Sequence, residues 1–331
     1  MRSTARAICW GTAWLGIVAS GWAWAQIPTV TLRQASDALQ DGQADRALAL
    51  LAPLPTQGPG AAEAQNLICR VRLTLKQWDL AAKACGMAVQ LDGQNSSYHM
   101  WLGRALGEQA GRATFVTAFM LGRRVVSEFQ TAVQLDPRNA GALSDLGMFY
   151  REAPAIVGGG LDKADAMAAQ LDHVNPAKAY EMRGNIAVTR KDYGTAERDY
   201  KQAIAVSPHP AEQWTRLANF YRDRQRWNEM DAAIRACFAA AGHDKESGVG
   251  LYDGAGILYE TNRDPALAAK MLEDYLANCP KSEEAPTFIA HVRLGWLMQE
   301  LGDGAEARQQ FAAAAAMASE YVPSQEQGSK H

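Results

Sequence analysis

The stretch that decides the fold runs from residue 177 to 210 and reads AKAYEMRGNIAVTRKDYGTAERDYKQAIAVSPHP. Gly184 lies within a predicted first helix, Ala196 follows 12 residues later, and Tyr200 follows four after that. Small residues at these places let two helices cross closely, and the aromatic ring fills the space beside them. Pro208 then ends the second helix, because proline lacks an amide hydrogen and clashes with the preceding turn. The stretch therefore predicts a pair of packed helices.

The same spacing recurs along the chain. In four further units a residue at the helix crossing is followed 12 residues later by a small or apolar one: Cys69 and Ala81, Ala218 and Met230, Gly256 and Ala268, and Gly295 and Ala307. This pattern resembles the tetratricopeptide repeat, a helix-turn-helix unit of 34 residues. The resemblance implies an all-α fold, a right-handed superhelical solenoid in which each helix pair packs on the next.

The repeat frame divides the chain into segments. About seven repeats fill residues 61–321, a degenerate helical pair with a Pro/Gly-rich linker occupies 26–60, and a polar tail, 322–331, is expected to be disordered. Two adjacent repeats are lengthened, by residues within 104–124 and 152–161.

The second lengthened repeat contains Tyr150, Ala153-Pro154 and Gly158-Gly159. It resembles a subgroup of exported bacterial tetratricopeptide proteins that have a lengthened repeat and an Ala-Pro-x-x-x-Gly-Gly loop. That resemblance implies an envelope location and no defined activity.

The first residues have the form of a secretory signal. Arg2 and Arg6 precede an uncharged stretch over 8–24, and Ala23-Trp24-Ala25 has the small-x-small form of a cleavage site. We expect a signal peptide over 1–25, cleaved after Ala25, and a periplasmic or secreted mature chain. A retained membrane anchor is the alternative. No later stretch is apolar enough to cross a bilayer, so no membrane span is expected after cleavage.

Charge and motif content exclude several functions. Without the two leader arginines the chain has 31 basic and 36 acidic side chains. It therefore lacks the excess of basic residues that is typical of nucleic-acid-binding proteins. The six histidines are scattered, with no His-Glu-x-x-His zinc motif and no nucleophile elbow. We therefore expect no enzyme activity, no catalytic residue, no cofactor and no metal site.

The resemblance also implies a binding surface. In tetratricopeptide proteins a concave groove is lined by first-helix residues at roughly the second, fifth, ninth and twelfth places of each unit. The candidates at these places here are Arg70, Trp101, Arg104, Met148, Arg151, Glu181, Asn185, Thr215, Asn219, Arg222, Asp253 and Ile257. Their side chains suit hydrogen bonding to an extended peptide, so we expect protein or peptide partners. A merely solvated inner face is the alternative.

The two insertions form a second candidate surface. Phe115 and Phe119 lie at helical spacing ahead of Arg123 and Arg124, and Ile156 lies in the second insertion. Because the insertions fall in adjacent repeats, we expect them to touch and to form one irregular surface. The apolar stripe is either a docking face or packs on its own repeat or on the 152–161 loop.

Four cysteines follow the leader, in what should be an oxidising compartment. Cys69 and Cys85 fall at core places on facing helices, where they form either a disulfide or two buried thiols. Cys237 and Cys279 end consecutive second helices and are a weaker candidate pair.

These observations predict an exported scaffold or adaptor that mediates protein–protein interaction in the bacterial cell envelope. A non-catalytic regulatory or accessory subunit of an envelope enzyme or transporter is the alternative, and an enzyme in its own right is the least favoured reading. The sequence names neither an individual partner nor an oligomeric state.

Overall fold

The computed structural model describes residues 20–244 and 246–323, and that part of the chain folds into eight antiparallel helix pairs. The pairs are α1 (Ser20–Gln40) with α2 (Ala44–Leu51), α3 (Ala61–Thr74) with α4 (Trp78–Leu91), α5 (Ser96–Ala110) with α6 (Phe115–Leu135), α7 (Ala140–Glu152) with α8 (Leu161–Leu171), α9 (Pro176–Thr189) with α10 (Tyr193–Val206), α11 (Pro210–Asp223) with α12 (Trp227–Ala241), α13 (Gly248–Glu260) with α14 (Pro265–Asn278), and α15 (Thr287–Glu300) with α16 (Gly304–Met317). A short 3₁₀ helix, η1 (Ala155–Val157), lies between α7 and α8.

The turn inside six of the eight pairs has a recurring geometry. A residue with positive φ follows the first helix of these pairs, at Gly42, Lys76, Lys191, Gln225, Asn262 and Gly302. Gly42 and Lys76 are 34 residues apart, and so are Lys191 and Gln225. The backbone therefore repeats with the period that the sequence predicts, even where lysine or glutamine has to adopt the left-handed conformation.

The predicted helix crossings are confirmed. A Cβ added to Gly184 would lie 3.0 Å from the ring of Tyr200, and one added to Gly295 would lie 2.6 Å from the ring of Phe311. In both of these pairs the aromatic ring of the second helix lies against the backbone of the glycine in the first helix. The two helices can pack this closely because glycine has no side chain.

Successive pairs stack side by side, and the odd-numbered helices α1 to α15 contact one another in order. The buried apolar side chains form two large clusters. One spans α3 to α9, and the other combines α1 to α3 with α9 to α16. The second cluster thus joins residues from both ends of the chain, from Leu32 to Tyr321.

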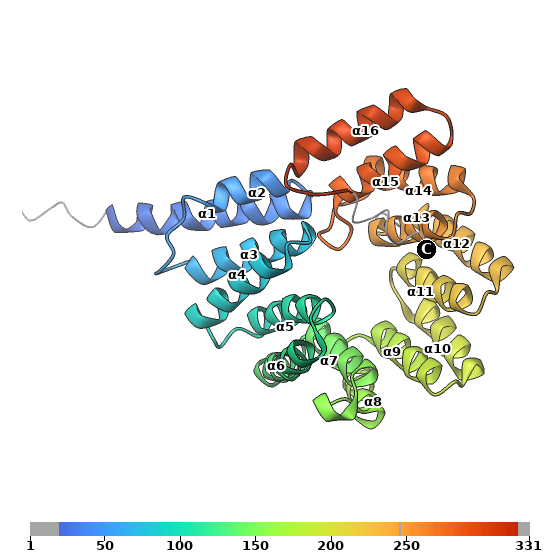
Figure 1. Ribbon diagram of the computed structural model, residues 1–331, viewed down its shortest axis with the longest axis horizontal. Coiled ribbons are helices and arrows are strands. Elements are labelled where there is room, and N and C mark those ends of the chain that lie inside the picture. The colour runs from blue at the N-terminus through green and yellow to red at the C-terminus, as the bar shows by residue number, and fades with distance from the viewer. Residues whose placement is uncertain (1–19, 245, 324–331) are drawn as a thin grey trace, which may run out of the picture.

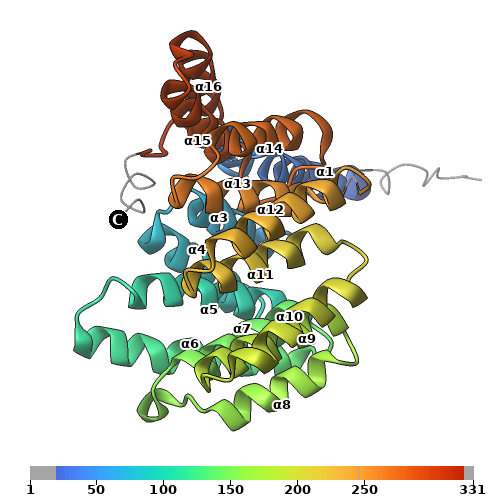
Figure 2. The same ribbon diagram turned by 90° about the vertical axis from the view of Figure 1, so that its right-hand side faces the viewer.

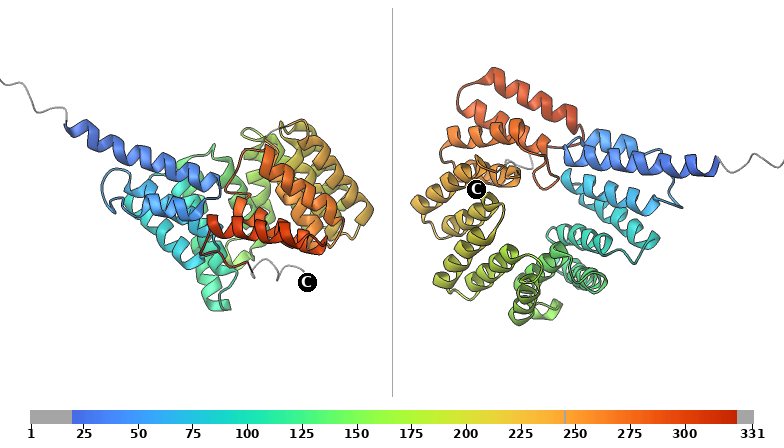
Figure 3. Two further views of the ribbon diagram at one scale, coloured as in Figure 1. Left: turned by 90° about the horizontal axis from the view of Figure 1, so that it is seen from above. Right: turned by 180° about the vertical axis from the view of Figure 1, so that it is seen from behind.

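The solenoid curves until its two ends meet. Helix α16 contacts α2, and Figure 1 shows the eight pairs arranged in a ring in which α1 and α2 lie next to α15 and α16. The view from behind in Figure 3 shows the same closure. The repeat pattern predicted the stacking of the pairs, but not this contact between the first pair and the last.

We call the contact between the two ends the seam. Polar contacts across it join Arg70 and Glu283, Arg72 and Glu320, Gln77 and Glu320, Asp45 and Ser319, and Gln40 and Glu283. Gly42 lies so close to Thr287 that an added Cβ would be 2.8 Å from its backbone nitrogen. The closed ring therefore has an apolar core at the seam and ionic contacts around it.

The inserted segments touch, as predicted. Helix α6 has 21 residues where α4 and α10 have 14, and it contacts η1. A Cβ added to Gly122 of α6 would lie 3.8 Å from the side chain of Val157. The two insertions thus form one surface on the outside of the ring.

Parts of the expected leader and tail lie outside the described residues, namely 1–19 and 324–331. Helix α1 begins at Ser20, six residues before the predicted mature start at Gln26, so it runs through the expected cleavage site. Among the described residues, no helix combines the length and the apolar character that crossing a bilayer requires.

Candidate protein-binding groove

Three adjoining cavities follow the inside of the ring, and we call them together the inner-face groove. The first, of 350 Å³, lies at the seam and includes Trp78, Trp101, Arg104, Pro286 and Ile289. The second, of 190 Å³, shares Arg104 with the first. The third, also of 350 Å³, shares Arg151, Glu181, Asn185 and Arg216 with the second. The shared residues make the groove continuous from α3 to α11.

The seam cavity is built from both ends of the chain. The ring of Trp101 on α5 contacts two guanidinium groups, with its centroid 5.3 Å from the Cζ of Arg70 and 4.5 Å from that of Arg104. Pro286 and Ile289 come from the segment that leads into and begins α15. This apolar, tryptophan-lined hollow exists because the ring is closed.

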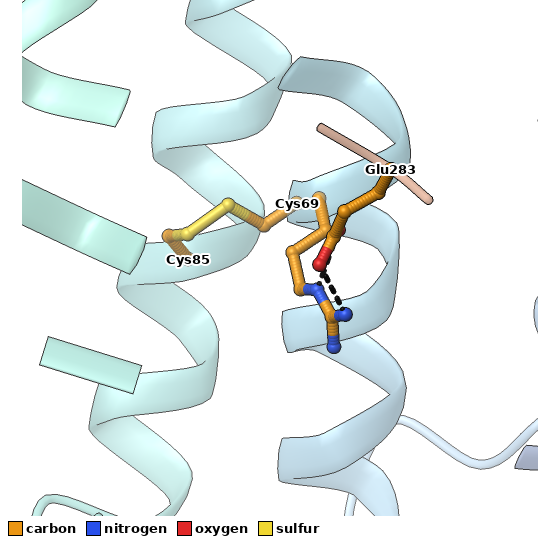
Figure 4. The surroundings of a disulfide bond; sticks show 4 residues. Cys69, Cys85 and Glu283 are labelled. Atoms are coloured by element: carbon orange, nitrogen blue, oxygen red, sulfur yellow. Dashed lines mark hydrogen bonds and ion pairs between the residues drawn. A yellow bond between two sulfur atoms is a disulfide. The ribbon is translucent and has the colours of Figure 1, made fainter. Parts of the chain in front are cut away.

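A disulfide stands beside the seam. Cys69 of α3 and Cys85 of α4 are joined, with their Cα atoms 5.2 Å apart, which is the first of the two predicted alternatives. The residue after Cys69 is Arg70, whose Nη2 and Nε donate to Glu283 at 2.6 and 2.9 Å. Figure 4 shows the disulfide and this ion pair side by side. The covalent link therefore fixes the helix that carries the Arg70–Glu283 contact.

The weaker cysteine prediction is wrong. Cys237 and Cys279 are both free thiols. Cys237 is fully buried, and its thiol donates to the carbonyl oxygen of Gly250 at 3.3 Å. Burial raises the pKa of the Cys237 thiol well above its ordinary value, so this group is an inert part of the core.

A charged network lies along the inside of the ring beside the second and third cavities. The Arg216 guanidinium on α11 faces three carboxylates, at 2.9 Å from Glu212, 3.4 Å from Glu181 and 3.7 Å from Asp253. Burial raises the pKa of Asp253 to about 6, although Arg216 opposes this shift. Helices α9, α11 and α13 are thus tied together on the inner face by one arginine.

A partly buried ion pair lies nearby. Arg104 Nε donates to Asp145 Oδ2 at 2.6 Å, and burial raises the pKa of Asp145. The predicted groove residues did not include Asp145 or Arg216. A signal for Arg216 was present, since Glu181, Arg216 and Asp253 alternate in sign at nearly the same place of three consecutive first helices.

Two asparagines offer hydrogen-bonding groups in the third cavity. Tyr200 donates its hydroxyl to Asn185 Oδ1 at 2.7 Å, which holds the Asn185 amide in one orientation. The Oδ1 of Asn219 is buried and accepts no hydrogen bond from any described residue. An unsatisfied buried carbonyl oxygen destabilises the folded state.

Most of the predicted groove residues line the cavities, and some do not. Those that do are Arg70, Trp101, Arg104, Met148, Arg151, Glu181, Asn185, Asn219 and Arg222. Thr215 and Ile257 are buried, with 0% and 4% of their surface exposed, so the prediction that they face the groove is wrong. Asp253 serves as a counter-ion of Arg216.

The predicted insertion surface is exposed. Phe115 is 87% exposed and Ile156 is 73% exposed, while Phe119 is partly buried. Arg123 and Arg124 are also exposed. For Phe115, the alternative that the stripe packs on its own repeat or on the 152–161 loop is therefore wrong.

Within residues 20–244 and 246–323, no group of three or more His, Cys, Asp or Glu side chains is placed to hold a metal ion.

Comparison with solved structures identifies the fold. A thermophilic tetratricopeptide-repeat protein of Thermus thermophilus is 20% identical to this chain, with a TM-score of 0.50 over 58% of this chain and 98% of the other. This chain has the tetratricopeptide-repeat fold. A tetratricopeptide-repeat protein from Parabacteroides merdae is 12% identical, with a TM-score of 0.45 over 92% of this chain and 98% of the other. No protein-family model matches the sequence, and no curated protein matches it either.

Proposed function

We propose that this tetratricopeptide-repeat protein is an exported scaffold or adaptor of the bacterial cell envelope that binds an extended protein segment along its inner-face groove. The observation that carries the proposal is the continuity of the three cavities, linked by Arg104, Arg151, Glu181, Asn185 and Arg216. Cavities of this size accept side chains and an extended backbone.

The chemistry of the groove supports a peptide ligand. A peptide backbone offers an N–H and a C=O at each residue, and an asparagine amide both donates and accepts hydrogen bonds. Asn185 and Asn219 both line the third cavity, and the Asn219 Oδ1 has no hydrogen-bond partner among the described residues. The charges around them are paired, as in Arg222 with Glu260 at 3.1 Å. We therefore expect hydrogen bonding and shape, more than net charge, to select the partner.

A photo-crosslinking amino acid at Met148 tests the groove. Met148 lines the second cavity and is 50% exposed. We expect this variant to capture a protein from the native envelope, and Asn185→Ala/Asn219→Ala in the same chain to lower the yield at least fivefold. The matched control carries the same amino acid at Gln202, an exposed residue of the outer helix α10. Equal capture from both positions would refute binding in the groove.

The proposed location is supported by two observations. The uncharged stretch over 8–24 ends in a small-x-small site, and the Cys69–Cys85 disulfide suits an oxidising compartment. Fractionation of a bacterium that expresses the whole chain, followed by N-terminal sequencing, tests it. We expect protein outside the cytoplasm that begins at Gln26. Recovery of the uncleaved chain from the cytoplasm would overturn the location and leave the groove experiment unaffected.

The second candidate is a non-catalytic accessory subunit of an envelope enzyme or transporter. Closure of the ring favours it, because a partner held inside a closed ring exchanges slowly. The Met148 crosslinks separate the two candidates. One product at a fixed stoichiometry supports the subunit, and a series of products supports the scaffold.

A further inference from the structure

The tip of α6 exposes an apolar surface that no other described element covers. Phe115, Val116 and Met120 are 87%, 69% and 68% exposed, and Ile156 of the adjoining η1 is 73% exposed. Figure 2 shows the α5–α6 connection at the left edge of the molecule, reaching further out than the neighbouring helices. We call these four residues and Phe119 the α6 tip. None of them lines the inner-face groove.

The charged side chains in the segment around the tip are three arginines, two of which pair with glutamates at the borders of that segment. Residues 109–127 contain Arg112, Arg123 and Arg124 and no Asp or Glu. Arg112 is paired with Glu108 at 3.0 Å, and Arg124 is 3.7 Å from Glu128. Arg123 is exposed and has no ion-pair partner among the described residues. The chain as a whole is mildly negative, whereas the charged side chains of residues 109–127 are all basic.

The apolar and basic groups follow one another along a single face of the helix. At 3.6 residues per turn, Phe115, Phe119, Val116, Met120 and Arg123 fall on one side of α6. Arg123 stands eight residues beyond Phe115, about 12 Å along the helix axis. With the N-terminal end of α6 pointing into a bilayer, apolar side chains buried roughly 5–10 Å deep would leave Arg123 at the level of the lipid headgroups.

We propose that the α6 tip docks the protein on the surface of an anionic phospholipid bilayer. Phe115, Val116 and Met120 enter the boundary between headgroups and acyl chains, and Arg123 and Arg124 contact the phosphates. Charge complementarity favours a membrane over a second copy of the chain, which would bring the same arginines against each other. The ring would then stand on the membrane with its groove free.

Vesicle flotation of the purified mature chain tests the proposal. We expect the protein to float with vesicles of phosphatidylglycerol and phosphatidylcholine, and not with phosphatidylcholine alone. Binding should weaken as salt rises, because the exposed arginines are screened. Phe115→Ser/Met120→Ser should lower the partition coefficient at least tenfold, and Arg123→Gln/Arg124→Gln should lower it by about fivefold per arginine.

Matched variants control for surface changes. Leu80→Ser/Leu301→Ser removes two apolar side chains elsewhere that are 50% and 46% exposed, and Arg138→Gln/Arg308→Gln removes two exposed arginines. Both should bind vesicles like the unaltered protein, and circular dichroism should show all variants equally folded. Absence of binding to anionic vesicles, or equal binding by the Phe115→Ser/Met120→Ser variant, overturns the proposal. Self-association that this variant abolishes, without vesicle binding, overturns it in favour of a second copy.

Discussion

Asp253 of the inner-face network makes the free energy of unfolding depend on pH. Its pKa of about 6 in the folded chain exceeds the ordinary 3.8, because burial disfavours the carboxylate. Between pH 4 and 6 the folded state therefore binds more protons than the unfolded state, and the free energy of unfolding falls as pH rises. We expect a loss of about 1–3 kcal/mol over that interval from this group. Asp253→Asn does not titrate and should remove that part of the slope in urea unfolding between pH 4 and 7.

An exposed aspartate, Asp37 of α1, provides the control for that experiment. Asp37→Asn should leave the pH dependence as it is in the unaltered protein. If Asp253→Asn behaves in the same way, Arg216 holds the Asp253 carboxylate charged throughout, and the assigned pKa is wrong.

Glu197 on α10 has the opposite dependence. Partial burial would raise its pKa, but hydrogen bonds from Lys201, Arg226 and Tyr221 lower the pKa of Glu197 to about 2. Its contribution to stability is therefore complete above its ordinary pKa of 4.5 and is lost as pH falls towards 2. Glu197→Gln should cost about 1–2 kcal/mol at pH 7. Thermal melts at falling pH should show this difference vanish, and a constant difference would contradict the assignment.

At the scale of the helix, the close packing of two helices in a pair depends on single glycines. A Cβ at Gly103 of α5 would lie 2.4 Å from the Phe129 ring, a rigid group that cannot move aside cheaply. Gly103→Ala should therefore destabilise the protein by about 1–3 kcal/mol. Gly107, one turn later in the same helix, has open space at its Cβ position. Gly107→Ala should stabilise by about 0.5–1 kcal/mol, because glycine is a poor helix former. Chemical unfolding of both variants compares the two, and destabilisation by Gly107→Ala would contradict this packing.

The α3–α4 pair has a covalent link in addition. The Cys69–Cys85 disulfide closes a loop with a sequence separation of 16, for which restriction of the unfolded chain contributes about 3 kcal/mol. Cys69→Ser/Cys85→Ser should lower the free energy of unfolding by about that amount, and a reductant should reproduce the loss in the unaltered protein. Cys279→Ser, which removes a free and partly exposed thiol, is the control. Equal stability with and without reductant would show that the bond contributes nothing.

These elements could be predicted because each depends on nearby residues. Gly184, Ala196 and Tyr200 lie within one unit, and so do Cys69 and Cys85, so the repeat frame alone brings them together. The burial of Thr215 and Ile257 could not be predicted in the same way, because it depends on how closely neighbouring repeats stack. The exposure of Phe115 likewise depends on how far α6 extends beyond its partner helix.

At the scale of the whole molecule, no local sequence pattern could have predicted the seam. Arg70 and Glu283 are 213 residues apart, and no motif relates them. Whether they meet depends on the small rotation between neighbouring pairs, summed over the whole array. A slight change in that rotation would leave every pair intact and the ring open. The seam cavity and the enclosure of the groove are therefore properties of the complete chain.

The two ends should separate when the seam is obstructed. Gly42 has φ of +72°, and a Cβ there would lie 2.8 Å from Thr287, so Gly42→Ala adds both backbone strain and a clash across the seam. Gly58 has φ of +88° with open space around it, so Gly58→Ala adds only the strain, about 1 kcal/mol. Small-angle X-ray scattering should show a larger radius of gyration for Gly42→Ala and an unchanged one for Gly58→Ala.

The ionic part of the seam can be tested separately with Glu283→Gln, which leaves the partly buried Arg70 without its carboxylate. This change should cost about 1–3 kcal/mol and should add to the expansion caused by Gly42→Ala. Because Trp101 and Ile289 reach the seam cavity from opposite ends of the chain, opening should also increase the solvent exposure of Trp101. If both variants keep the dimensions of the unaltered protein, apolar packing between the end pairs holds the ring closed without these contacts.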